Sequence, residues 1–183
     1  MEPLQLSFYK GLKGTQGAIQ FNYQRPHFYI KSNPKLKNFQ GKFIPDHWNQ
    51  EGTYMKEDLS SREGALFMEV CSAIGNNEYD WTRKIKMALS IVDLGKLLTV
   101  LEGVKPDVKI LHDPGAKSAT QGEITKTFNV SCPKGLATGV FITVTQSTKN
   151  EEIITHQLGL SGEDVKVLAV CIRGVIPSAL AWI

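Results

Sequence analysis

The sequence is poor in cysteine and lacks the motifs of common catalytic and metal sites. Only three of its 183 residues are cysteine, at positions 71, 132 and 171, and no two of them form a CxxC pair. An odd number of separated cysteines excludes a disulfide scaffold, argues against a structural zinc site and favours a reducing compartment. P-loop, GxGxxG, GxSxG and HExxH patterns are also missing. We therefore expect no enzyme, no cofactor, no metal and no small-molecule substrate.

Long apolar runs and targeting signals are absent as well. No stretch approaches the ~18–20 consecutive apolar residues of a membrane helix, so we expect no membrane partner. Residues 1–4 have neither the basic and apolar regions of a signal peptide nor the composition of a transit peptide. The expected location is intracellular and reducing: a microbial or viral cytoplasm, or an organelle matrix after a leader has been removed.

Acidic residues are missing from one long window near the start of the chain. Between Lys10 and Lys42 the sequence carries seven Lys or Arg residues and no Asp or Glu, although the whole chain has a net charge of only +3. Aromatic residues are interleaved with these cations. Cations that follow a phosphate backbone, next to rings on which bases stack, are typical of single-stranded nucleic-acid binding. The alternative is a solvated basic face whose rings point into the core.

The apolar pattern predicts several strands and two helices. Alternation favours strands at residues 21–30, 65–72, 82–90, 108–111, 123–130, 139–146 and 152–158. Residues 91–102 change to helical spacing, with Gly103 as a stop signal. Ser161 is a predicted N-cap of a second helix that Pro177 kinks or ends. We predict an α+β fold and one domain over residues 1–183, with an inserted loop at residues 32–53.

Three blocks of sequence, in order, carry a family resemblance. The first reads REGALF from Arg62, YDWTRK from Tyr79, and LS with DLG from Leu89. The second has HDP from His112, then KS, Gly and Lys at 117–118, 122 and 126. The third begins with LAV at Leu168, passes Pro177 and ends with LAW. Over about 120 of its 183 residues the chain resembles the Whirly family of single-stranded DNA-binding proteins.

The resemblance implies both a fold and a function. It implies two antiparallel four-stranded β-sheets packed at a steep angle, helices that close the core, and a homotetramer that binds single-stranded DNA. The implied role is sequence-tolerant binding in replication, repair or recombination, and possibly in transcription. Two alternatives stay open: a single-stranded RNA-binding or annealing protein of the related mitochondrial type, and a structural oligomer whose basic loop binds a protein. Residues 14–20 lack both lysines of the family's KGKAALS strand.

The predicted site consists of cations and rings, and the predicted oligomer core lies on the closing helix. The lysines expected to contact phosphates are Lys10, Lys13, Lys31, Lys84 and Lys86. The rings expected to stack on bases are Tyr23, Phe28, Tyr29, Tyr54 and Trp81, each of which could instead belong to the core. The residues expected between subunits are Leu168, Ile172, Leu180 and Trp182, with burial inside a single chain as the equal alternative. His112 and Asp113 are interpreted as part of a turn rather than as a catalytic pair.

Overall fold

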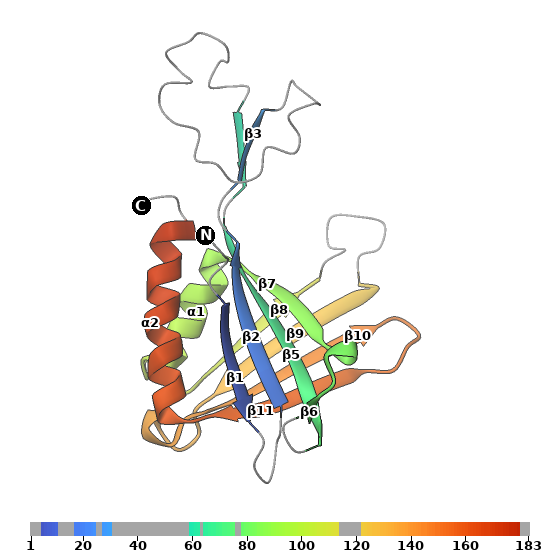
Figure 1. Ribbon diagram of the computed structural model, residues 1–183, viewed down its shortest axis with the longest axis vertical. Helices are drawn as coiled ribbons and strands as arrows, with labels where there is room; N and C mark the ends of the chain where they lie inside the picture. The colour runs from blue at the N-terminus through green and yellow to red at the C-terminus, as the bar shows by residue number, and fades with distance from the viewer. Residues whose placement is uncertain are drawn as a thin grey trace.

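The computed structural model describes residues 5–10, 17–24, 27–30, 59–62, 64–75, 78–113 and 122–179. Within this part, two antiparallel sheets cross one another, and two helices lie together at one end of them (Figure 1). The predicted α+β fold with two antiparallel sheets is therefore confirmed. Residues 32–53, the predicted insertion, lie outside the described residues.

The first sheet has four principal strands in the order β1–β2–β5–β7. Their bounds are β1 (Gln5–Lys10), β2 (Gly17–Gln24), β5 (Ala65–Gly75) and β7 (Ile85–Leu89). The two-residue β6 (Glu78–Tyr79) pairs with the far end of β5 beyond a shift in register. A separate two-stranded ribbon is formed by β3 (His27–Ile30) and β4 (Leu59–Arg62), and it projects from the sheet body in Figure 1.

The second sheet is a four-stranded antiparallel sheet in the order β11–β10–β9–β8. Its strands are β8 (Asp107–His112), β9 (Ile124–Ser131), β10 (Val140–Thr148) and β11 (Ile154–Leu160). Each of them overlaps one of the four strands that the sequence predicts in this half of the chain: β8 is longer at both ends, and the other three begin one or two residues later and end one or two residues later than predicted. Neighbouring strands follow one another along the sequence, so hairpin connections account for the order of the sheet.

Both helices begin with a reciprocal cap. In α1 (Ile91–Leu101) the Ser90 hydroxyl accepts from the Asp93 backbone N–H, and the Asp93 carboxylate accepts from the Ser90 backbone N–H at 3.0 Å. Ser161 and Asp164 form the same pair of bonds before α2 (Gly162–Ala179), which confirms the predicted N-cap. Pro177 lies in the last turn of α2, and the helix continues to Ala179. In the described part of the chain, neither helix is long and apolar enough to cross a membrane.

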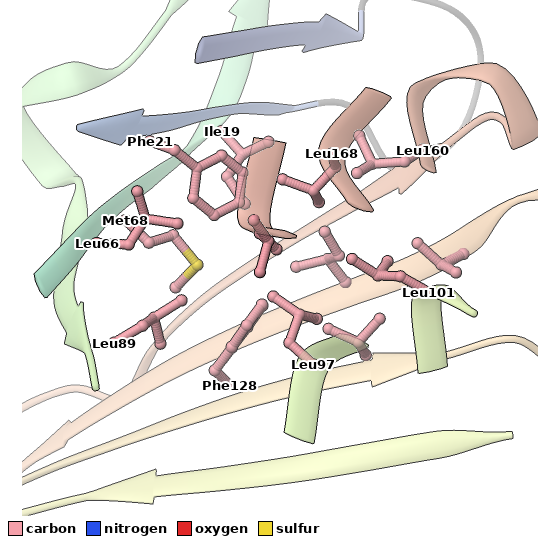
Figure 2. Packing of buried hydrophobic residues seen from close by; sticks show 14 of the residues in the cluster. Ile19, Phe21, Leu66, Met68, Leu89, Leu97, Leu101, Phe128, Leu160 and Leu168 are labelled. Atoms are coloured by element: carbon pink, nitrogen blue, oxygen red, sulfur yellow. The ribbon is translucent and has the colours of Figure 1, made fainter. Parts of the chain in front are cut away.

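The core lies between the two sheets and under the helices. Figure 2 shows side chains from both sheets and both helices meeting there, among them Phe21, Met68, Leu97, Phe128 and Leu168. Each of these five is at most 2% exposed. Because side chains alternate along a strand, burial of one face leaves the neighbouring residues of each strand on the outer face of its sheet.

The structure adds one strand and changes the bounds of two predicted ones. The sequence analysis did not predict β1. The alternation predicted at residues 21–30, around a break at Arg25 and Pro26, corresponds to two strands, β2 and β3, and β2 begins earlier than predicted, at Gly17. The predicted strand at 82–90 begins only at Ile85, because Trp81–Arg83 forms a 3-10 turn (η4) in which the Asp80 carboxylate accepts from the Thr82 backbone N–H. A short polar side chain thus competes with strand pairing at this point.

Candidate nucleic-acid interface

The outer face of the first sheet is the face turned away from the second sheet, and it combines cations with aromatic rings. The strand register sets its composition, because Leu66, Met68 and Val70 of β5 point into the core and Phe67 and Glu69 point outward. Residues that are paired directly across neighbouring strands point to the same face of the sheet and form a row across it. The outward-facing rows are Asn22 with Phe67 and Ala88, then Ser7 with Gln20, Glu69 and Lys86, then Tyr9 with Ala18 and Cys71.

Two lysines on β7 and its approach share a single carboxylate. The Lys84 ammonium donates to Glu69 Oε2 at 2.9 Å, and the Lys86 ammonium lies 3.5 Å from Glu69 Oε1. The lysine side chains are 40% and 55% exposed, whereas that of Glu69 is only 10% exposed. Burial opposes ionisation of Glu69, but the hydrogen bond from Lys84 and the charges of both lysines outweigh it and lower the pKa of this carboxyl. Both ammonium groups therefore remain available to a ligand on their outer sides.

Three rings lie on the same face. The Lys86 ammonium lies 4.8 Å from the centroid of the Phe67 ring, a cation–π distance. The rings of Tyr9 and Tyr79 are 5.3 Å apart at an angle of 54°. The Tyr9 side chain remains about half exposed. Such rings are surfaces on which unpaired bases could stack.

Small side chains lie beneath the tyrosine pair. Ala18 and Cys71 share the row of Tyr9, and both are fully buried. Burial raises the pKa of the Cys71 thiol to about 11, so this cysteine is a structural side chain and not a reactive thiol.

Contacts with the second sheet hold β7 and the turn before it in place, and this is the segment that carries Lys84 and Lys86. The Lys126 ammonium of β9 donates to the Lys86 backbone carbonyl at 2.8 Å, and burial lowers the pKa of Lys126. His156 of β11 is buried and links β5 to the turn η4: its Nε2 lies 2.8 Å from the Arg83 carbonyl and its Nδ1 lies 2.8 Å from the Ser72 hydroxyl. Since a carbonyl can only accept, Nε2 carries the proton and donates. The turn before Lys84 is thereby anchored at its base.

The structure describes the predicted site residues to different extents. Lys84 and Lys86 lie on the outer face of the first sheet, and Trp81 is half-buried in the turn just before them. For Lys10, Phe28 and Tyr29 the structure describes the backbone, in β1 and β3, but not the side chains. Outside the described residues lie Lys13, Lys31, Tyr54, Leu180 and Trp182.

Tyr23 has a different place from the one predicted. It packs against the core near α2, and its hydroxyl donates to Ser178 Oγ at 3.1 Å. With Phe21 and Leu168 it lines an apolar pocket between the first sheet and α2. Tyr23 therefore joins β2 to the helix, on the opposite side of the sheet from Phe67.

Leu168 and Ile172 are buried within the chain itself, at 1% and 0% exposed. The prediction that these two residues pack between subunits is revised, because no surface of either is left for a second chain. Val167 and Val170 are the exposed apolar residues of the same helix, at 49% and 66%.

The sequence analysis missed Tyr9, Phe67, Glu69 and Tyr79 as site residues. Phe67 and Glu69 could have been found, because period-two alternation separates them from the apolar Leu66 and Met68. The meeting of Tyr9 with Tyr79 has no local signal, since it depends on how β1 and β6 are placed in one sheet.

His112 has a structural partner. Its Nε2 lies 3.0 Å from Asp93 Oδ2, the same carboxylate that caps α1. The neighbouring Asp113 carboxylate accepts from the Gly122 backbone N–H at 2.9 Å, as a turn residue would. Among the described residues, no group of three or more His, Cys, Asp or Glu side chains could hold a metal ion.

Comparisons with known proteins point to one family. Residues 42–169 match the family model described as "Whirly transcription factor". The mitochondrial single-stranded DNA-binding protein WHY2 of Arabidopsis thaliana is 30% identical over 124 residues, which cover 66% of this chain and 50% of that protein. The chloroplastic single-stranded DNA-binding protein WHY1 of Solanum tuberosum is 27% identical over 125 residues, which cover 67% of this chain and 44% of that protein. The chain thus spans about half the length of the curated relatives it matches.

The fold matches solved structures over nearly the whole chain. The crystal structure of WHY3 from Arabidopsis thaliana superimposes with a TM-score of 0.74 at 20% identity, and the match covers 98% of this chain and 89% of that one. At this identity the likeness shows a shared fold, two crossed antiparallel sheets with helices at one end.

Proposed function

Because this chain belongs to the Whirly family, we propose that it binds single-stranded DNA with little dependence on base sequence. The observation that carries the proposal is the outer face of the first sheet, where Lys84 and Lys86 lie beside the ring of Phe67. Relatives of this chain are named single-stranded DNA-binding proteins, which supports the same ligand.

In the proposed mechanism, the two kinds of side chain have separate tasks. Ammonium groups neutralise phosphates, which any nucleic acid offers. Rings stack on bases, which only an unpaired strand exposes, and every base has a π-face. Preference for single strands therefore depends on the rings, and tolerance of sequence follows because stacking and phosphate contacts do not read the edges of the bases. Binding alone, without a chemical step, is the proposed activity.

The proposed biological role is genome maintenance. A protein that covers unpaired strands acts in replication, repair or recombination, and control of transcription is a further proposed role. The names of the relatives refer to mitochondria and chloroplasts, and an organelle matrix is the compartment that we propose here.

Competition among nucleic acids tests the proposed ligand. Single-stranded DNA, single-stranded RNA and duplex DNA of equal length are offered to the labelled complex at one salt concentration. Displacement by single-stranded DNA at the lowest concentration is the expected result. Displacement by RNA at a lower concentration would identify an RNA-binding protein, and equal displacement by duplex would show a merely electrostatic surface.

Salt dependence tests the electrostatic part of the mechanism. If about five lysines meet phosphates, log affinity should fall with log salt concentration at a slope of about −3 to −4. Lys86→Ala should make this slope shallower by about 0.7, because one phosphate contact is lost. Lys105→Ala, an exposed residue beyond the end of α1, is the control and should leave the slope unchanged. A wild-type slope near zero would contradict the mechanism.

Assembly as a homotetramer is the remaining part of the proposal. The exposed apolar stripe of α2 at Val167 and Val170 is the proposed contact, in place of the buried Leu168 and Ile172. We expect light scattering to give about 80 kDa, four times the 20.3 kDa of one chain. Val170→Asp should lower that mass without unfolding the chain, since the side chain is exposed. A monomeric wild-type chain at micromolar concentration would contradict this arrangement.

A further inference from the structure

The Lys84–Glu69–Lys86 cluster is an unusual feature for a surface that binds polyanions. Glu69 lies on the central strand β5, between the cations of β7 and the polar residues of β2. Its carboxylate contacts both ammonium groups, at 2.9 and 3.5 Å, and is itself 10% exposed. A carboxylate in this position places a negative charge where a phosphate would receive the most favourable contacts.

The surroundings of the cluster keep it in this arrangement. The Lys86 ammonium rests over the Phe67 ring, and its backbone carbonyl accepts from Lys126 of the second sheet. The lowered pKa of Glu69 keeps the carboxylate ionised at neutral pH, since its causes include the charges of both lysines. The three charged groups therefore sum to one positive charge and not to two.

We propose that the Glu69 carboxylate competes with nucleic-acid phosphates for the ammonium groups of Lys84 and Lys86. Glu69 holds these two side chains in position and limits the electrostatic part of the affinity for nucleic acid. This inference rests on the proposed function and adds a residue that sets its strength. Because Glu69 cancels half of the positive charge of the two lysines, the outer face of the first sheet attracts polyanions less strongly. Stacking on the aromatic rings then makes up a larger share of the difference in affinity between ligands. Bound DNA then dissociates faster than it would from a face that carried both charges uncompensated.

Glu69→Gln separates the charge of this residue from its shape. Glutamine has the same length, and its side-chain oxygen can still accept from the Lys84 ammonium. Removing one negative charge about 5 Å from a phosphate should tighten binding about fivefold at low ionic strength. One more phosphate is then neutralised, so the salt slope should become steeper by about 0.7. The probes are an unstructured oligothymidylate and heparin, a polyanion without bases.

Glu78→Gln is the matched control. It removes the same charge from an exposed position on β6 of the same sheet, away from the two lysines. If Glu69 acts through its place between the lysines, Glu69→Gln tightens binding of both probes and Glu78→Gln changes neither beyond about twofold. Equal effects of the two variants, unchanged binding, or weaker binding of Glu69→Gln would each overturn the inference.

The two probes separate this inference from the proposed function. A wild-type chain that binds heparin but not oligothymidylate would contradict single-stranded DNA binding, while the Glu69 variants would still be compared on heparin. Should Glu69→Gln fold poorly, Glu69→Thr removes the same charge with a side chain that suits a strand, and the same comparison is made with it.

Discussion

Replacing Phe67 with alanine is expected to weaken binding of single-stranded DNA about tenfold or more. A base stacked on an aromatic ring contributes about 1–3 kcal/mol, and a loss of about 1.4 kcal/mol is tenfold in affinity. Phe67 also supports the Lys86 ammonium at 4.8 Å, so the substitution removes a stacking surface and loosens a cation together. Binding of duplex DNA should change by no more than about threefold, because its bases are already stacked within the helix. Titration of a fluorescent oligonucleotide and of a duplex of equal length measures both.

Phe141→Ala is the control for this prediction. Phe141 is about half exposed on β10, on the outer face of the second sheet, and it is aromatic like Phe67. Its loss should leave single-strand binding nearly unchanged if the DNA follows the first sheet. Thermal melting of both variants shows whether either change acts through stability. Equal weakening by the two substitutions would mean that the strand crosses both sheets.

Much of the fold could be predicted because its signals are local. In β7 (Ile85–Leu89) the buried and exposed residues alternate without exception, as the sequence pattern does. Ser161 precedes an acidic residue by three positions and forms the predicted cap. Ser90 has the same spacing and forms the same cap, which the sequence analysis did not name although its signal is equally local. Such signals act within a few residues, and nothing distant in the chain overrides them here.

Other elements could not be predicted because they depend on distant partners. β1 has only two core-facing apolar residues, Leu6 and Phe8, and its place is fixed by its ladder with β2. Leu168 and Ile172 are apolar on a helix, and a sequence pattern does not distinguish a core inside one chain from a core between chains. The structure resolves this, because both are covered by the chain itself.

In the candidate site, too, local features could be predicted from the sequence and contacts between distant strands could not. Lys84 and Lys86 could be placed outward from the alternation of one strand. Their shared contact with Glu69, 15 residues before Lys84, depends on the pairing of β5 with β7. Tyr23 was predicted to stack because it lies in the basic window, yet its parity along β2 matches that of Phe21, which is buried. Composition indicates the class of ligand that we propose, and register decides which residues could contact it.

The junction between β11 and α2 depends on a glycine from another part of the chain, Gly139, which lies directly against Leu160 and Ser161. Gly139 ends the 3-10 turn Leu136–Thr138 (η5) with φ 98° and ψ −166°, a conformation that is essentially restricted to glycine. A Cβ at this position would overlap the Leu160 carbonyl oxygen and lie 2.9 Å from the Leu160 carbonyl carbon. Leu160 is the last residue of β11, and Ser161, the N-cap of α2, follows it. The Leu160 carbonyl group therefore cannot move away from a new Cβ without displacing the end of β11 and the first turn of α2.

Gly139→Ala is therefore expected to lower the free energy of unfolding by more than about 4 kcal/mol, a loss seen only for severe local conflicts. Gly135→Ala is the matched control, because Gly135 begins the same turn at φ 85° and ψ 155° and a Cβ there meets nothing within 4 Å. The control should lose only the backbone cost, about 1–3 kcal/mol. Urea denaturation followed by circular dichroism measures both variants, and a Gly139→Ala chain that does not fold at all agrees with the prediction. Equal losses for the two substitutions would contradict the prediction, because they would show that the junction between β11 and α2 moves aside to make room for the added Cβ.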